Sequence, residues 1–479
     1  MSTITQNVNA GVVEVARLLR GSTDSTRRAA RLVCLFGSKT TPNGPLNVHY
    51  IVDIPEQGYR VLCETGVNGG FQSITPLTPA AAWYERELQD RFGIELPGHP
   101  DPRPLLLHES KGEYPFLKVE GEGVCEVAVG PVHAGIIEPG HFRFSVMGDN
   151  VLFLELRHFY THKGMEKLFE EAPVTGGQMI AESVSGDNCF SHAVAYSQAI
   201  EDAHGVIVPP RAESIRLIGL ELERMMAHIA DVGALANDVA FVLPNAYCSR
   251  IKEDLLQASM RVIGTRYWRG VAIPGGVTCD LDPPKAAMLG EAVESAAANF
   301  SRIAGIILDR PSVQARFEAA GILKRSVAED FAVVGPAARA SGVDVDVRRD
   351  HPYGAYKNAI VEVPSFHYGD VLARARIRIE EAAFSAQMIA AALKNLPEGP
   401  VRADTPRTGS FEGFSAVESP RGELLYWIKG ENGLISRCAI KSPSFQNWPA
   451  LPHAVIGNVI ADFPLINKSF NLSYSGCDR

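Results

Sequence analysis

The chain has 479 residues, 46% of them apolar and 21% charged, with a formal net charge of −9. This length exceeds one ordinary hydrophobic core, so two or three domains are expected. The composition excludes extended disorder as the main character, and the negative charge gives no basic surface for nucleic acid.

The cysteines are scattered, and no two lie within three residues of each other: Cys34, Cys63, Cys125, Cys189, Cys248, Cys279, Cys438 and Cys477. No Cys-x-x-Cys pair exists, so spacing indicates no local zinc or iron–sulfur site. Scattered thiols in a large chain are typical of a reducing cytoplasmic compartment. No run of 18 apolar residues occurs, so membrane association is expected to come through partner subunits.

The first 115 residues predict a small α+β domain. An amphipathic run over 12–19 predicts a first helix. Four short apolar runs have strand character, namely 31–36, 47–53, 59–64 and 71–74. The period then changes to that of a helix over 78–92. The prolines between 97 and 104 predict an extended linker, because serial prolines forbid a helix or a central strand.

From residue 118 to about 162 the pattern is β-like. Three alternating runs predict strands at 125–130, 141–146 and 151–156, with a hairpin turn at Gly148-Asp149-Asn150.

The stretch from 163 to 400 is helical. Apolar stripes predict long helices of a packed bundle at 211–236, 250–267, 284–308 and 368–396. In the last of these, Arg376, Arg378, Glu380 and Glu381 are expected on a solvated face or a subunit contact. The pattern is β-like again over 411–440, and a short helix is expected after 450.

Two sets of motifs carry a family resemblance. Residues 83–94 and 97–107 resemble the signature of the 30-kDa-type subunit of respiratory complex I. Other segments are similar to the complex I 49-kDa-type and nickel–iron hydrogenase large-subunit family, namely 130–144, 162–167, 211–217, 274–277, 418–423, 442–447 and the terminal Asp478-Arg479. The fused arrangement looks most like the large subunit of formate-hydrogenlyase-type, membrane-bound hydrogenases.

The resemblance implies an α+β chain of two domains. Residues 1–115 would form a complex I 30-kDa-like α+β domain with its proline-rich linker. Residues 118–479 would form a hydrogenase large-subunit/49-kDa-like helical bundle with small β elements at its start and end.

The resemblance also locates the metal ligands of the family, which are two Cys-x-x-Cys pairs. Here the first pair corresponds to Ser185 and Asn188, and the last pair to Ser473 and Gly476. Nickel and low-spin iron share bridging thiolates, which oxygen donors replace poorly, so a nickel–iron centre is not expected. Cys189 and Cys477 lie one residue beyond, and a slipped two-thiolate site remains an alternative, although one residue on a helix turns a side chain by ~100°.

Other site residues follow from the resemblance. Glu138 matches a proton-passing glutamate, Arg421 an arginine beside the metal's diatomic ligands, and His192 the histidine of the first ligand motif. Glu138 is expected beside a buried cavity, where a carboxylate suits proton transfer. Asp187, in the former ligand loop, could add a second carboxylate. The blander alternatives are a Glu138–Arg421 ion pair and a hydrogen-bonded core role for His192.

Complex I lacks the same thiolates and uses the vacated cavity for a quinone head group. The histidine that assists there corresponds to His133 or His141, which could equally stabilise their loop. The quinone-binding tyrosine falls on Gly186 in this chain, and Tyr474 is the candidate to replace it.

The resemblance finally implies a function. The chain would be a subunit of a membrane-associated oxidoreductase complex, peripheral on the cytoplasmic side, with a small iron–sulfur partner and proton-pump-like membrane subunits. It would form a quinone- or proton-coupling cavity, with iron–sulfur clusters on the partner. It carries no Gly-x-Gly-x-x-Gly loop, so any NAD site would lie on another chain. The alternative is a non-catalytic scaffold between a membrane ion-transport module and cytoplasmic partners.

Overall fold

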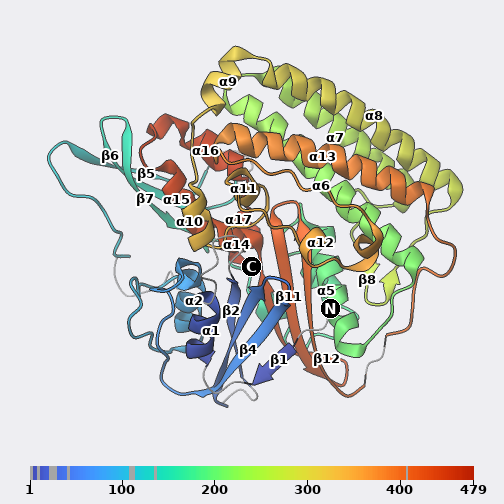
Figure 1. Ribbon diagram of the computed structural model, residues 1–479, viewed down its shortest axis with the longest axis horizontal. Helices are drawn as coiled ribbons and strands as arrows, with labels where there is room; N and C mark the ends of the chain where they lie inside the picture. The colour runs from blue at the N-terminus through green and yellow to red at the C-terminus, as the bar shows by residue number, and fades with distance from the viewer. Residues whose placement is uncertain are drawn as a thin grey trace.

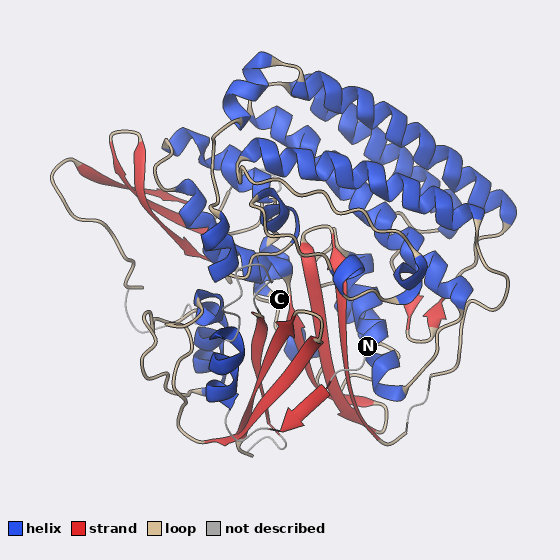
Figure 2. Cartoon of the chain, viewed as in Figure 1, coloured by secondary structure: helices blue, strands red, loops and turns tan. Residues whose placement is uncertain are grey.

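The computed structural model describes residues 4–7, 11–20, 30–39, 44–106, 114–133, 137–405 and 408–479. Figure 1 shows a layer of long helices above two sheets, with a third, narrow sheet projecting from one side. Figure 2 shows the same mixed α+β arrangement by element type, as the sequence predicts. Within the described residues, no helix combines the length and apolarity needed to cross a bilayer.

The N-terminal sheet has the order β1-β4-β3-β2, and its strands are β1 (Ile4–Asn7), β2 (Arg31–Lys39), β3 (Leu46–Ile54) and β4 (Gly58–Val67). All pairs are antiparallel except β1 with β4. Helix α1 (Gly11–Arg20) packs on β3 and β4. A 3-10 turn η1 (Pro79–Ala81) leads into α2 (Ala82–Phe92), which packs on β2.

The prediction of a strand at 71–74 is wrong. Phe71 and Ser73 donate backbone hydrogen bonds to the carbonyls of Glu95 and Pro97, so this segment runs beside the linker instead of joining the sheet. The buried Glu85 carboxylate accepts from the Ile74 amide at 2.7 Å. The Glu85 side chain thus supplies the hydrogen-bond acceptor that a neighbouring strand would otherwise give to Ile74.

The projecting sheet, here called the arm, consists of β5 (Val124–Val129), β6 (His141–Met147) and β7 (Asn150–Arg157) in that order, all antiparallel. The predicted hairpin turn joins β6 to β7, and Gly148 adopts a positive φ of 60° there. The phenylalanine face of β6 is buried against α16 (Phe463–Phe470), where Phe142 and Phe144 contact Phe463.

The helical bundle is built from α6 (Pro210–Asp238), α7 (Val242–Ile263), α8 (Pro283–Leu308) and α13 (Val371–Lys394), with α6 against both α7 and α13. Helix α7 begins eight residues before the predicted start and ends at Gly264, whose φ of 89° is a left-handed cap. Shorter elements connect these helices: α3 (Met165–Leu168), α4 (Gly177–Ala181), α5 (Cys189–His204), β8 (Ala272–Ile273), β9 (Gly276–Val277), α9 (Pro311–Phe317), α10 (Arg325–Asp330), α11 (Gly335–Ala340), α12 (Val347–Asp350) and η2 (Gly354–Asn358).

The C-terminal region forms a second large sheet and a set of short helices. Its strands are β10 (Ser410–Ser419), β11 (Gly422–Glu431) and β12 (Leu434–Lys441). Helix α5 packs on β10 and β11. The helices that follow, besides α16, are α14 (Pro443–Asn447), η3 (Trp448–Ala450), α15 (Leu451–Val455), η4 (Ile460–Asp462) and α17 (Tyr474–Asp478).

A buried carboxylate joins the N-terminal sheet to the C-terminal sheet. Glu423 on β11 accepts from Arg31 at 2.5 Å and from Tyr59 at 2.5 Å, and Lys441 lies at 2.7 Å. Burial opposes ionisation, but Arg31 and Lys441 hold the pKa of Glu423 well below its usual range. This cluster fixes the two sheets at one orientation.

Glu423→Ala is therefore expected to lower the free energy of unfolding by about 3–5 kcal/mol, because it leaves the buried Lys441 ammonium without its carboxylate and Arg31 with Asp53 alone. Urea unfolding of the purified chain measures this. The matched control is Glu431→Ala at the exposed end of the same strand, where a change within about 0.5 kcal/mol is expected. Equal losses in the two variants would contradict a specific role for Glu423.

Candidate functional site

The four former ligand positions meet at one point of the fold. The loop before α5 carries Ser185 and Asn188, Ser473 directly precedes α17, and Gly476 lies in the first turn of α17. The Ser185 and Ser473 hydroxyl oxygens are 3.1 Å apart, and Ser473 accepts from the Gly476 amide at 2.9 Å. A Cβ atom added to Gly476 would lie 3.4 Å from the Cβ of Ser185. The structure thus brings loop and tail into direct contact.

The residues at this junction do not fit a nickel–iron group. They offer two hydroxyls, one amide and one glycine, whereas nickel and low-spin iron require bridging thiolates. The Asn188 carbonyl oxygen is already bonded to Arg421. Among the described residues, no group of three or more His, Cys, Asp or Glu side chains is arranged to hold a metal ion.

The two displaced cysteines face different surroundings. Cys189 is fully buried and its thiol donates to the Tyr267 carbonyl at 3.3 Å. Cys477 is also fully buried, beside the charges of Asp478 and Arg479. Burial raises the pKa of both thiols, which disfavours the thiolate that a metal would need. This geometry gives the slipped two-thiolate site no support.

Arg421 clamps the junction. Its guanidinium donates to Asp187 at 2.6 Å, to Asn188 at 2.5 Å and to the Asn471 carbonyl at 2.5 Å. Partial burial opposes ionisation of Asp187, but the charge of Arg421 outweighs it and lowers the pKa of Asp187 to about 2. The alternative of a Glu138–Arg421 ion pair is wrong, because the carboxylate that Arg421 binds is that of Asp187.

Glu138 lies at the rim of the junction and is exposed, so its expected position beside a buried cavity is wrong. Its carboxylate accepts from the Ser475 amide at 2.8 Å. The Ser475 hydroxyl in turn donates to the Val184 carbonyl at 2.9 Å and accepts from Lys163 at 2.5 Å. Glu138 therefore stands on the same loop–tail junction as Asp187, which is 52% exposed at its side chain.

The candidate histidines make structural contacts. His192 is buried, its Nδ1 lies 2.8 Å from the Tyr426 hydroxyl, and burial lowers its pKa to about 3. That is the geometry of a neutral core histidine. The Nε2 of His133 lies 2.7 Å from the Gly140 carbonyl, which fits a loop-stabilising role. His141 is buried against Phe116, and burial lowers its pKa.

Tyr474 lines a buried aromatic group that contains a residue the motifs did not indicate. Burial raises the pKa of Tyr474 to about 12, and its hydroxyl accepts from Asn467 at 3.4 Å. The ring of His158 lies 4.2 Å from that of Trp448 and 5.5 Å from that of Tyr474. Neither ring nitrogen of His158 has a hydrogen-bond partner among the described residues, and burial lowers its pKa to about 3. The sequence signal was weak: one histidine at the end of an apolar strand.

A buried ionic cluster, which no motif indicated, lies between α6, α13 and β10. Its members are Glu221, Arg224, His228, Arg339, Asp346, Arg348, Glu381 and Glu418, each at most 2% exposed. Arg339 binds Glu381 at 2.7 Å and Glu418 at 2.9 Å, and Arg348 binds Glu221 at 3.1 Å. The prediction that Arg378 and Glu381 lie on a solvated face is wrong, since both are buried. The sequence pattern that could have indicated this cluster is the presence of charged residues within the apolar stripe of α6.

A further buried carboxylate supports the former ligand loop from behind. Glu223 on α6 accepts from the amides of Phe190 and Ser191 at 2.8 and 3.1 Å, in the first turn of α5. Burial raises its pKa to about 7. Glu223 therefore satisfies the free amides at the start of α5 and can exchange a proton near neutral pH.

Comparisons with known proteins establish the family of the chain. Residues 238–413 and 406–479 match the family described as respiratory-chain NADH dehydrogenase, 49 Kd subunit, and residues 7–120 match the 30 Kd subunit family. Together the two matches span most of the chain, in the order that the motifs indicate. The chain belongs to the 49-kDa subunit family, fused to a 30-kDa-type region.

Two relatives resemble the chain over nearly its full length. Formate hydrogenlyase subunit 5 of Escherichia coli is 31% identical over 94% of this chain and 84% of that protein. Hydrogenase-4 component G of the same organism is 32% identical with the same coverage. A chain of the membrane-bound sulfane sulfur reductase, an archaeal respiratory membrane complex, shares the fold with a TM-score of 0.70 and 24% identity, over 75% of this chain and 99% of that one.

Glu223 generates a pH prediction. Because its folded-state pKa of about 7 exceeds the usual 4.5, the folded chain holds a proton that the unfolded chain releases between these values. Its contribution to the free energy of unfolding is present below pH 4.5 and is lost as pH rises to 7, by up to about 3 kcal/mol. Urea unfolding at pH 5 and 7 should show that Glu223→Gln removes this fall, while the exposed control Glu294→Gln keeps it. An unchanged pH slope in Glu223→Gln would sink the assignment.

Proposed function

We propose that the chain is a subunit of a complex-I-like or membrane-bound-hydrogenase-like respiratory complex, peripheral on the cytoplasmic side, that works without nickel–iron chemistry. In this proposal it comprises a 30-kDa-like domain, residues 1–115, and a 49-kDa-like domain, residues 118–479. The observation that supports it is the loop–tail junction, where Ser185 and Ser473 share a hydrogen bond instead of metal-binding thiolates.

The rim of this junction is where coupling to a partner would occur. Glu138, which accepts from the Ser475 amide, and Asp187, which accepts from the Ser185 hydroxyl, both present carboxylates to solvent. Carboxylates at a subunit boundary can pass protons to a neighbouring chain. We assign the iron–sulfur clusters to a small partner subunit at this rim, and a quinone head group to the side of Tyr474, His133 and His141. Proton-pump-like membrane subunits complete the complex.

The alternative is a non-catalytic scaffold that couples a membrane ion-transport module to cytoplasmic partners. One observation favours it: the Arg421 guanidinium ties together Asp187, Asn188 and Asn471, so the former metal position is closed by hydrogen bonds. The redox function and the scaffold function differ in whether a cluster-binding small subunit is present. A cluster-binding small subunit in the purified complex supports redox work, whereas electrons cannot arrive without it.

The first test is elemental. The complex purified through a tag on this chain is expected to contain no stoichiometric nickel and to reduce no dye with hydrogen, because Ser185, Asn188, Ser473 and Gly476 supply no thiolates. A nickel–iron hydrogenase measured in parallel is the positive control. One nickel per chain, or hydrogen turnover, would overturn the proposal.

The second test addresses the rim. Glu138→Gln removes an ionisable group and keeps its shape, and it is expected to lower quinone-dependent activity of the purified complex about 10²-fold if Glu138 passes protons. Arg421→Ala frees Asp187 and is expected to lower activity as well. The control Arg269→Ala changes an arginine outside the clamp, with a half-exposed side chain, and should leave activity unchanged. Wild-type activity in both rim variants would favour the scaffold.

A further inference from the structure

The arm exposes an unpaired strand edge. Strand order places β5 at the outside, and among the described residues no strand pairs with its outer edge. Figure 1 shows the arm extending away from the rest of the molecule. Unpaired backbone amides and carbonyls on a protruding edge readily accept another strand, and proteins usually protect such edges with lysine, proline or a bulge. The Val124-Cys-Glu-Val-Ala-Val129 strand carries none of these.

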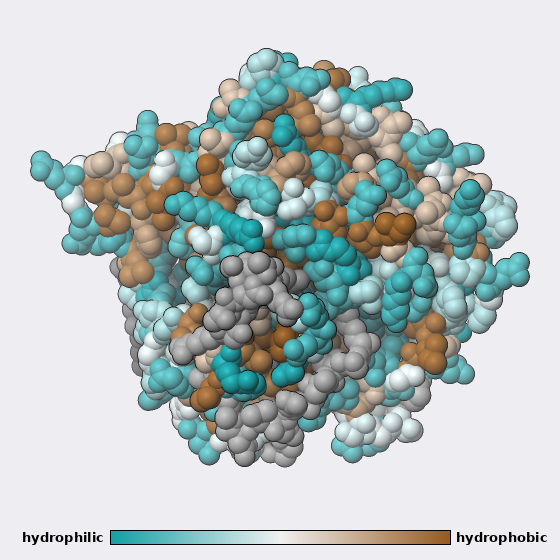
Figure 3. All heavy atoms as spheres, in the orientation of Figure 1, coloured by the Kyte–Doolittle hydropathy of each residue, from teal (hydrophilic) through white to brown (hydrophobic). Residues whose placement is uncertain are grey.

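The apolar face of the arm continues past the body of the protein. Cys125, Val127 and Val129 oppose Val146, Phe144 and Phe142 of β6 in register, so they share the face that is buried under β6. The body of the protein covers this face under β6 but not under β5, so Cys125 and Val127 are exposed. Figure 3 shows hydrophobic residues gathered on this projection. Exposed apolar residues that continue a buried layer indicate a surface covered by a partner.

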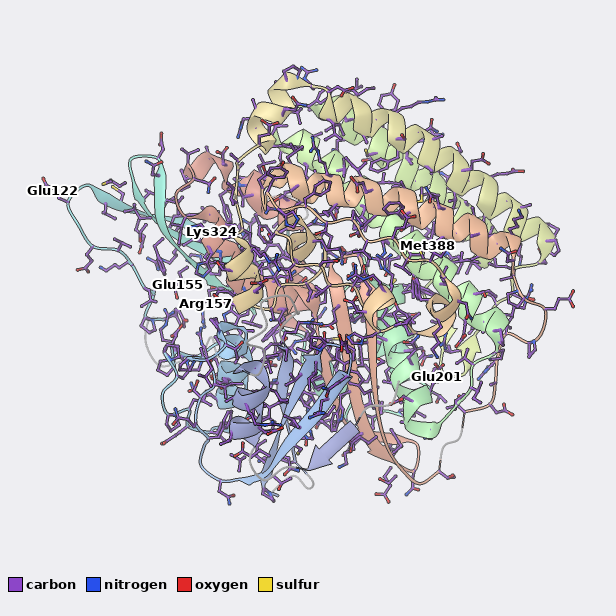
Figure 4. The ribbon with its side chains drawn as sticks, viewed as in Figure 1. Glu122, Glu155, Arg157, Glu201, Lys324 and Met388 are labelled. Carbon is purple, nitrogen blue, oxygen red and sulfur yellow. The ribbon has the colours of Figure 1, made fainter. Side chains whose placement is uncertain are left out.

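The charge around this edge is acidic. Glu120, Glu122 and Asp149 are exposed at the tip, where the start of β5 meets the β6–β7 turn, and Lys118 pairs with Glu120 at 3.2 Å, which leaves an acidic excess. Figure 4 shows Glu122 at the outer end of the arm, with Glu155 and Arg157 at its base. Glu126 on β5 itself is paired with Arg143.

A second copy of this chain is a poor occupant of the edge. Its own β5 carries no lysine or arginine, and the charge that it does carry, Glu126, is already paired with Arg143, so a second copy supplies no positive charge to Glu120, Glu122 and Asp149. A strand rich in lysine or arginine has the complementary charge. Cytoplasmic loops of membrane proteins carry an excess of these residues.

We propose that the outer edge of β5 receives an extended, basic strand from a partner subunit, which lengthens the arm to a four-stranded sheet and covers Cys125 and Val127. The inference rests on the proposed membership of a multisubunit complex. Backbone pairing gives the affinity, alternating apolar side chains contact Val127, and lysine or arginine residues of the partner face Glu120, Glu122 and Asp149.

Cys125 provides the test, because among the eight cysteines it is the exposed one, six being buried and Cys279 half-buried. The chain by itself and the complex purified through it are treated with a maleimide, and Cys125 is quantified by mass spectrometry. Labelling is expected to be at least roughly tenfold slower in the complex, and amide exchange over 124–129 to slow similarly. Dissociating the complex should restore both.

A maleimide–succinimide cross-linker on Cys125 then identifies the occupant, since it captures a nearby lysine. The expected product joins Cys125 to a lysine in a basic segment of a partner subunit. The double reversal Glu120→Lys/Glu122→Lys is expected to restore labelling of Cys125, whereas Glu291→Lys/Glu294→Lys, on exposed positions of α8, should not.

Each other outcome overturns the inference. Equal labelling in the chain and the complex would show a free edge while leaving the proposed function intact. A cross-link to a second copy, or to a segment without basic residues, would contradict the assigned occupant. A chain that purifies without any partner subunit would overturn the proposed function together with this inference.

Discussion

The buried ionic cluster is the constraint on which the arrangement of the C-terminal region depends. Helix α6 carries Arg224 into the interior, and a buried charge is tolerated only when it is paired and hydrogen-bonded. Arg224 donates to the carbonyls of Glu418 and Ser419 at 2.6 and 3.1 Å, which fixes the end of β10. The turn that follows holds Arg421. A Cβ atom on Gly335 would lie 2.1 Å from the Arg421 carbonyl oxygen, so α11 packs directly on this turn.

This constraint also holds the loop–tail junction through hydrogen bonds of the chain itself. Here Arg421, held by the turn after β10, donates to the loop at Asp187 and to the tail at Asn471, and Ser185 bonds Ser473. Charge-assisted and neutral hydrogen bonds together contribute several kcal/mol at most to such a link. The loop and the tail are therefore joined by hydrogen bonds between oxygen and nitrogen atoms.

Local patterns predicted most elements, and their failures have one physical origin. The strands of the arm and the helices α6, α8 and α13 follow their periodicity to within a few residues. The segment 71–74 has the composition of a strand, but its backbone amides donate to Glu85 and to the linker. The spacing of Arg378 and Glu381 predicted a solvated face. In the structure both are bound in the interior, Arg378 by Asp231 and Glu381 by Arg339. Local composition cannot reveal a partner that lies in another element, 11 residues away for Glu85 and Ile74, 42 for Arg339 and Glu381, and 147 for Asp231 and Arg378.

The sequence alone determined the family and the order of its two regions, and it placed Ser185, Asn188, Ser473 and Gly476 where the resemblance expects thiolates, because these depend only on which residue occupies each position of a motif. The tertiary structure decided which of the retained polar residues act together. It paired Arg421 with Asp187, left Glu138 exposed at the rim and buried His192 against Tyr426. Burial and pairing set the charge of a side chain, and both arise from contacts between distant segments that no local pattern encodes.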